Sequence, residues 1–325
     1  MAKRVSGVSA IVGAAEPHAS YSRGGDEDAG NEGDARGTEQ GEEPSCAIKQ
    51  LPSRLLFKAA AVAAMINPVN EPVIGPSAAV SEGVLPSPLA IAVATAKYWG
   101  PSPRQLTVSF VETTPSDLRR RIVQHLNAWT IGVRFVETAR DGQVRISRRG
   151  GGYWSYLGTD ILLIPRGRPT MNLEAFTMNT PESEYRRVVR HEAGHSLGFQ
   201  HEHMRRQLVA RIDPAKAYDY FLRRYNWDRT TVDQQVLTAL DDRTIMGTPP
   251  DQDSIMCYQL PGSITTDGRP IRGGKDINST DSAFATRIYP RAAGGAGFSD
   301  ASGASSFGDD DWPESEDVQD VQLSA

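Results

Sequence analysis

The sequence predicts an α+β fold, in which a mixed twisted sheet and a long helix lie above a C-terminal part that is mostly irregular and helical. Two observations predict it. Short segments rich in β-branched residues occupy residues 106–164 with one amphipathic helix among them, and a second helix follows over 181–197. Hydrophobic residues make up 39% of the 325 residues, which is enough for a core over part of the chain.

Local patterns predict each element. The expected strands are 106–112, 133–137, 143–147 and 160–164. A helix is expected after Pro115, because one face of it carries apolar side chains, namely Leu118, Ile122, Leu126 and Trp129. The stretch GGGYWSYLG at 150–158 is interpreted as a Gly-aromatic loop.

Helix starts are predicted from side chains that can cap them. Thr180 is expected to cap the helix over 181–197. Asp213, before Pro214, is expected to begin another helix. Thr280–Asp281 is expected to cap a last helix, which ends near Tyr289.

Composition divides the chain into four parts. Residues 1–50 are expected to form a disordered acidic segment, 51–99 a helix and Pro-rich linker, 100–291 the main folded domain, and 292–325 a disordered acidic tail. The net charge of −5 conceals this division, because residues 46–291 hold 23 acidic and 31 basic residues. The body of the chain therefore carries a net charge of +8.

The two cysteines, Cys46 and Cys257, are too few for a disulfide framework, so the fold must depend on its core. A single bridge between them stays open. Residues 3–15 only faintly resemble a signal peptide, because their apolar part is short and interrupted by Ser and Gly. The apolar stretch 55–66 contains Lys58 and is too short to cross a bilayer, so we expect no membrane span.

The residues that carry chemistry are concentrated in the motif HEAGHSLGFQH. His191 and His195 are neighbours on one helix face, where both imidazoles can bind one Zn²⁺ ion, and Glu192 lies beside a water bound to it. Gly198 can take the left-handed conformation that ends a helix, which lets His201 approach the metal from another direction. Three protein ligands leave one tetrahedral position for water, as in catalytic zinc sites.

The spacing HExxHxxGxxH, continued by Glu202 and Arg205, resembles that of the astacin-like zinc metallopeptidases of the metzincin clan. The segment SIMCY at 254–258 resembles their Met-turn, and the resemblance covers about residues 104–290. It implies a metzincin-type zinc peptidase domain with an active-site helix. It also implies that Met256 forms an apolar floor beneath the zinc and that Tyr258 stabilises the oxyanion.

The resemblance gives roles to weaker elements as well. Residues 160–164 would form the edge strand that pairs with an extended peptide substrate, with an ordinary sheet strand as the alternative. His203 is interpreted as a neighbour of the site and not as a ligand. The chain lacks the disulfides of animal astacins, and no aspartate-switch motif precedes the domain. These departures indicate a disulfide-poor, microbial-type relative and leave activation, substrate preference and compartment open, with secretion favoured by the resemblance alone.

The sequence thus predicts a zinc-dependent endopeptidase that hydrolyses peptide bonds with a zinc-activated water and Glu192 as general base. We expect protein or peptide substrates, no nucleic-acid partner and a monomer. One alternative is a catalytically silent, zinc-bound peptide- or protein-binding module on the same scaffold, although such a module would be expected to lose Glu192 first. A nucleic-acid-binding protein would explain the charge of +8, but the arginines are scattered over many segments and form no known nucleic-acid motif.

Overall fold

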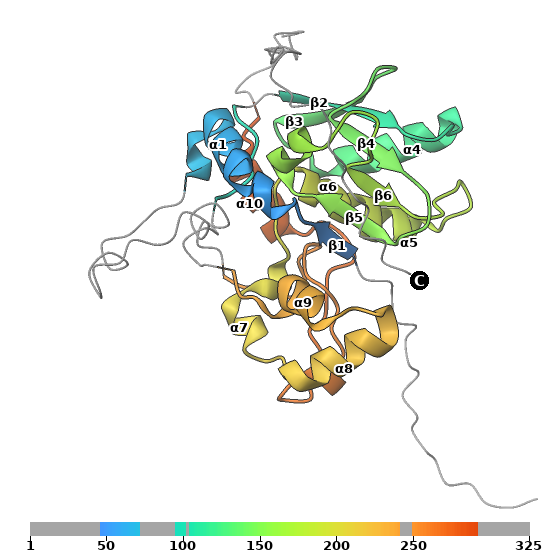
Figure 1. The fold of residues 1–325 in the computed structure, drawn as a ribbon. Helices are drawn as coiled ribbons and strands as arrows, with labels where there is room; N and C mark the ends of the chain where they lie inside the picture. The colour runs from blue at the N-terminus through green and yellow to red at the C-terminus, as the bar shows by residue number, and fades with distance from the viewer. Residues whose placement is uncertain (1–45, 72–94, 102–103, 241–248, 292–325) are drawn as a thin grey trace, which may run out of the picture. The chain divides into compact units, whose positions relative to one another are not determined.

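The computed structural model describes residues 46–71, 95–101, 104–240 and 249–291 (Figure 1). Six strands form one mixed sheet in the order β1-β5-β6-β4-β2-β3. The strands are β1 (Cys46–Lys49), β2 (Arg104–Phe110), β3 (Val133–Glu137), β4 (Val144–Ser147), β5 (Tyr153–Tyr156) and β6 (Met171–Leu173). Strands β2, β3, β4 and β6 are parallel, whereas β5 runs antiparallel to β6 and β1 runs parallel to β5. The predicted mixed sheet and α+β class are confirmed.

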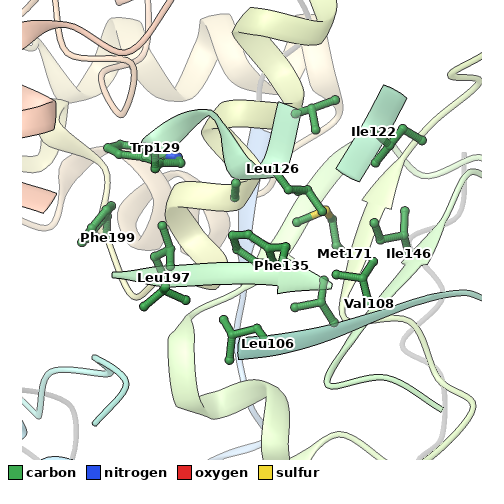
Figure 2. Packing of buried hydrophobic residues seen from close by; sticks show 14 of the residues in the cluster. Leu106, Val108, Ile122, Leu126, Trp129, Phe135, Ile146, Met171, Leu197 and Phe199 are labelled. Atoms are coloured by element: carbon green, nitrogen blue, oxygen red, sulfur yellow. The ribbon is translucent and has the colours of Figure 1, made fainter. Parts of the chain in front are cut away.

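The main core lies between this sheet and two helices, α4 (Ser116–Leu126) and α6 (Arg190–Ser196). Figure 2 shows side chains of α4 and of the residues that follow α6 packed in one cluster with the sheet. The labelled members of this cluster are Leu106, Val108, Ile122, Leu126, Trp129, Phe135, Ile146, Met171, Leu197 and Phe199. The apolar face predicted for α4 is the buried one. Burial of this many large side chains makes a rigid support for α6.

A second core lies in the C-terminal part, where Figure 1 shows α7 (Arg206–Val209), α8 (Pro214–Tyr225) and α9 (Arg229–Val232) on the far side of β1 from the rest of the sheet. Its buried residues include Phe221, Val236 and Leu260. Asp213 caps α8 as predicted, because its carboxylate accepts hydrogen bonds from the backbone N–H groups of Ala215 and Lys216.

Two predicted elements are wrong. Residues 160–164 do not form a strand, because most of them belong to a 3-10 helix over Gly158–Leu163 that buries Ile161 and Leu163. A short apolar run fits either structure, so its pattern alone does not decide between them. The expected loop at 150–158 contains strand β5 instead, whose aromatic residues favour a pleated, half-buried surface.

One predicted cap is wrong, and a second is only partly right. The helix expected from 181 begins after Pro181 without a side-chain cap, and Thr180 accepts a hydrogen bond from the backbone of Thr177. This helix runs through α5 (Glu182–Glu184) and a π-helical turn over Tyr185–Val189 into α6. The last helix, α10 (Ser279–Ile288), is capped by Asn278 in a capping box with Asp281.

The N-terminal region contributes more than its composition indicates. Residues 46–49, at the end of the segment for which disorder is expected, form β1 and bury Cys46 and Ile48. Within the predicted linker, α1 (Leu56–Ile66) packs near Leu163, and Trp99 is buried in the main core. Residues 1–45, 72–94 and 292–325 lie outside the described residues. Among the helices that are described, none has the length and apolar character needed to cross a membrane.

Candidate metal centre

Helix α6 and the turn that follows it bring the three predicted metal ligands together. His191 and His195 lie one helical turn apart, and Gly198 has the predicted left-handed conformation with φ of 95°. The turn is closed by hydrogen bonds from the N–H of Gly198 to the carbonyl of His195 (2.8 Å) and from the N–H of Phe199 to that of Gly194 (2.9 Å). As a result, Nε2 of His201 lies 2.9 Å from Nε2 of His195.

Hydrogen bonds to backbone carbonyls orient two of these imidazoles. Nδ1 of His191 lies 2.6 Å from the carbonyl oxygen of Ile255, and Nδ1 of His195 lies 2.8 Å from that of Phe199. In each ring Nδ1 therefore carries the proton and Nε2 keeps a lone pair for a metal. Burial lowers the pKa of His191 to about 4 and holds the pKa values of His195 and His201 well below their usual range. All three are neutral at physiological pH, as metal binding requires.

Cys46 joins these histidines as a fourth donor that the sequence did not predict. Its Sγ and one ring nitrogen of each of His191, His195 and His201 all lie within 4.8 Å of one another, and all four residues are buried. Strand β1 places the thiol there by pairing Cys46 with Tyr153 of β5. Cys46 and Cys257 are both free, so the bridge that the sequence left open is absent.

The donor set fits a zinc ion. Nε2 of His195 and Nε2 of His201 face each other. Because Nδ1 of His195 carries the proton of that ring, its Nε2 presents a lone pair that a metal ion can accept. Nε2 of His191 is buried and has no hydrogen-bond partner among the described residues. Ligand nitrogens of a tetrahedral zinc site lie roughly 3.3 Å apart, given Zn–N distances of about 2.0–2.1 Å. Three imidazole nitrogens and one thiolate form a donor set typical of zinc.

Glu192 lies beside this set on α6 and is fully buried. Neither of its carboxylate oxygens has a hydrogen-bond partner within the part of the chain that the structure describes. Burial raises the pKa of Glu192 to about 8, against the opposing effects of the Cys46 thiol and the Arg187 guanidinium. A bound zinc ion would lower this pKa, because its positive charge favours the carboxylate. A buried carboxylate without partners costs stability, so its presence indicates a role other than holding the fold together.

The Met-turn lies against the ligand helix. A Cβ atom at Gly194 would lie 2.4 Å from Sδ of Met256, so the glycine lets the Met256 side chain pack this close to α6. The turn is fixed from two sides. The N–H of Glu202 donates to the carbonyl of Met256 (2.8 Å), and the carboxylate of Asp281 accepts from Oγ of Ser254 (2.6 Å). Asp281 therefore supports the site from α10, a role the sequence did not reveal.

The ring of Tyr258 packs among the histidines of the site. Its centroid lies 4.3 Å from that of His201 and 4.5 Å from that of His203, and it stacks on His203 at 14°. The Tyr258 hydroxyl is buried and has no hydrogen-bond partner among the described residues. His203 lies outside the ligand set, as expected, because its Nε2 is 2.9 Å from the carbonyl oxygen of Gln235.

A cavity of about 60 Å³ adjoins the centre. Its lining includes Cys46, His191, Glu192, Tyr258 and Arg187. Two residues of the metal-ligand group, Cys46 and His191, thus share one cavity wall with the candidate catalytic side chains. Of strand β1, Cys46 is the residue that lines this cavity.

Comparison with solved structures relates this arrangement to known proteins. The chain is similar to myroilysin, with 29% identity, a TM-score of 0.57, and coverage of 61% of this chain and 97% of that one. A second myroilysin structure matches with 28% identity and a TM-score of 0.48, over 68% of this chain and 99% of that one. The hatching enzyme HCE-1, a zinc-protease from the medaka fish Oryzias latipes, matches with 21% identity and a TM-score of 0.42, over 60% of this chain and 95% of that one.

No protein-family model and no curated protein matches the chain. The first myroilysin structure carries the comparison, because it combines the highest identity and TM-score of these three with nearly complete coverage of its own length. The predicted resemblance to the astacin-like zinc metallopeptidases is confirmed. The buried group of three histidines and one cysteine could hold a metal ion.

Proposed function

We propose that this chain is a zinc-dependent endopeptidase, and that the conformation described above is its latent form. One observation carries the proposal, namely the convergence of three neutral, buried histidines on one point beside a buried carboxylate without partners. A zinc ion that only stabilised the fold would not require a buried carboxylate such as that of Glu192 beside its ligands. This argues against the alternative of a silent peptide-binding module.

The roles of the residues follow from their positions. Bound zinc supplies Lewis-acid chemistry, because it polarises a carbonyl group and lowers the pKa of water. His191, His195 and His201 hold the ion. Glu192 accepts the proton of the attacking water and passes it to the leaving amine. The hydroxyl of Tyr258 donates a hydrogen bond to the oxyanion that forms on the substrate carbon.

Latency follows from Cys46 and β1. With zinc bound, the Cys46 thiolate would be a fourth protein ligand beside the three histidines and would exclude the water. Strand β1 also covers the edge of β5, the edge on which an extended peptide could add to the sheet by β-augmentation. Hydrolysis therefore requires that Cys46 leave the centre.

The function is tested with the full chain and its Cys46→Ala variant, both loaded with zinc, on an unfolded protein and a peptide library. We expect one zinc per chain, and cleavage by the variant that a chelator abolishes and added zinc restores. A Cys46→Ala protein that is folded and holds zinc but cleaves neither substrate would count against the proposal and favour the silent module.

Replacing Tyr258 with phenylalanine in the Cys46→Ala background is expected to lower kcat by roughly a hundred- to a thousandfold, as for other single oxyanion donors. KM should change little, because the hydroxyl acts mainly in the transition state. Steady-state kinetics measures both constants, and zinc content serves as the control. An unchanged kcat would mean that Tyr258 only packs against its neighbouring histidines.

A further inference from the structure

Strand β1 is held by a side-chain amide on the edge that does not face β5. Oε1 of Gln235 accepts a hydrogen bond from the N–H of Ile48 (3.0 Å), and Nε2 of Gln235 donates one to the carbonyl of the same residue (3.0 Å). One amide thus makes both hydrogen bonds that a neighbouring strand would make to Ile48. The strand lies between β5 and Gln235.

Gln235 is fixed in place and linked to the candidate catalytic residues. It is buried, on a π-helical turn over Asp233–Leu237. Its own carbonyl oxygen lies 2.9 Å from Nε2 of His203, and His203 stacks on Tyr258. The amide is therefore held at a defined position relative to the metal centre, as a positioning group must be.

The position that β1 occupies between β5 and Gln235 is next to the metal ligands. Cys46, whose thiol joins the histidines, is two residues from Ile48 on the same short strand. An extended peptide that presents a bond to the metal from the edge of β5 must therefore lie where β1 lies. Its backbone would then pass the Gln235 amide.

We propose that Gln235 is a substrate-positioning residue, whose amide pairs with the backbone N–H and C=O of one residue of an extended peptide substrate after β1 has left. The inference rests on the proposed function and extends it. Rotation of the amide by half a turn exchanges its donor and acceptor, so it can serve a peptide that runs in either direction. Recognition through the backbone does not depend on the side chain at that position, which suits unfolded proteins of varied sequence.

The alternative is that Gln235 only holds β1 in the latent form. Loss of the amide would then loosen β1 but would not change how the enzyme treats the substrate backbone. Loss of the amide would raise the rate by loosening β1 and would lower it by weakening substrate binding. The rate of one variant on one substrate contains both effects and does not separate them. A comparison of two substrates within the same enzyme does, because the competing strand affects both substrates equally.

The experiment uses the zinc-loaded full chain with Cys46→Ala, alone or combined with Gln235→Met or Gln234→Met. Gln234 is the exposed neighbour and gives the matched control. The substrates are one peptide and a set of its analogues, in each of which an ester oxygen replaces one backbone N–H. We expect the ester at one position to lower kcat/KM by roughly five- to tenfold in the parent and in Gln234→Met, the effect of one lost hydrogen bond. In Gln235→Met the same ester should have almost no effect.

If the ester effect is equal in all three enzymes at every position, the inference about Gln235 is wrong. Cleavage of the peptide by these enzymes would still support the proposed function. Absence of cleavage in all three enzymes would overturn the proposed function, and the inference with it. Should Gln235→Met fail to fold, Gln235→Asn replaces it, because it keeps an amide but withdraws it by one methylene. The ester effect should vanish in that variant too.

Discussion

Replacing Glu192 with glutamine is expected to lower kcat by roughly a thousandfold, within the range typical of lost general-base catalysis. The amide has nearly the same size as the carboxylate but does not accept a proton at neutral pH. Zinc content should stay near one ion per chain, because Glu192 is outside the group of ligand residues. Kinetics of the zinc-loaded Cys46→Ala full chain, with and without the change, measures the effect.

The stability of this variant separates a catalytic role from a structural one. The Glu192 oxygens have no hydrogen-bond partner among the described residues, and the Cys46 thiol, which interacts with the carboxylate in the parent chain, is absent from the Cys46→Ala background. Thermal unfolding should therefore show no loss of stability, whereas loss of a structural carboxylate would lower the melting temperature. Glu71→Gln, at an exposed carboxylate, is the matched control and should change neither quantity. Retention of the parent rate by Glu192→Gln would place the general base elsewhere.

The parts of the site that lie close together in sequence were predictable. His191 and His195 are brought together by helical periodicity, and Gly198 redirects the chain so that His201 reaches them. These relations depend on local backbone geometry, which a short motif specifies completely. The same holds for the apolar face of α4, whose spacing identifies its buried residues.

The parts that depend on long-range packing were not predictable. Cys46 reaches the histidines only because β1 pairs with β5, and β5 lies in a stretch that the sequence presents as a glycine-rich loop. Gln235 and Asp281 reach the site from the C-terminal part of the chain, with no fixed spacing to the motif. A lone cysteine or glutamine has no periodicity, so only the fold reveals its partner.

The search for a latency device illustrates this difference. The family resemblance implies an aspartate-switch motif before the domain, and the sequence contains no recognisable one. The donor that faces the histidines is a sulfur atom, carried by a four-residue strand at the end of a long polar segment. Its only local signal is that Cys46 and Ile48 are apolar and alternate, as expected for a strand with one buried face.

Replacing Cys46 with alanine is expected to raise kcat/KM of the zinc-loaded full chain by roughly a hundredfold. The estimate corresponds to an open form populated at about 1% in the parent protein, within the range usual for a minor conformation. The Cys46 thiol competes strongly with any substrate for the metal, because β1 holds it at high effective concentration beside the histidines. Without the sulfur ligand, a position for water opens on the metal, although β1 keeps its contacts with β5 and Gln235.

Cys257→Ala is the matched control, because Cys257 is the other cysteine of the chain and is also buried and free. This variant should stay latent, since Cys257 is not one of the four residues that surround the metal position. Cobalt(II) in place of zinc gives a readout that does not depend on activity. An intense sulfur-to-cobalt absorption should be present in the parent and in Cys257→Ala, and absent in Cys46→Ala. Equal rates for parent and Cys46→Ala, with no sulfur-to-cobalt band in either, would show that Cys46 does not bind the metal. Latency would then have to come from β1 alone, through its pairing with β5 and the Gln235 amide.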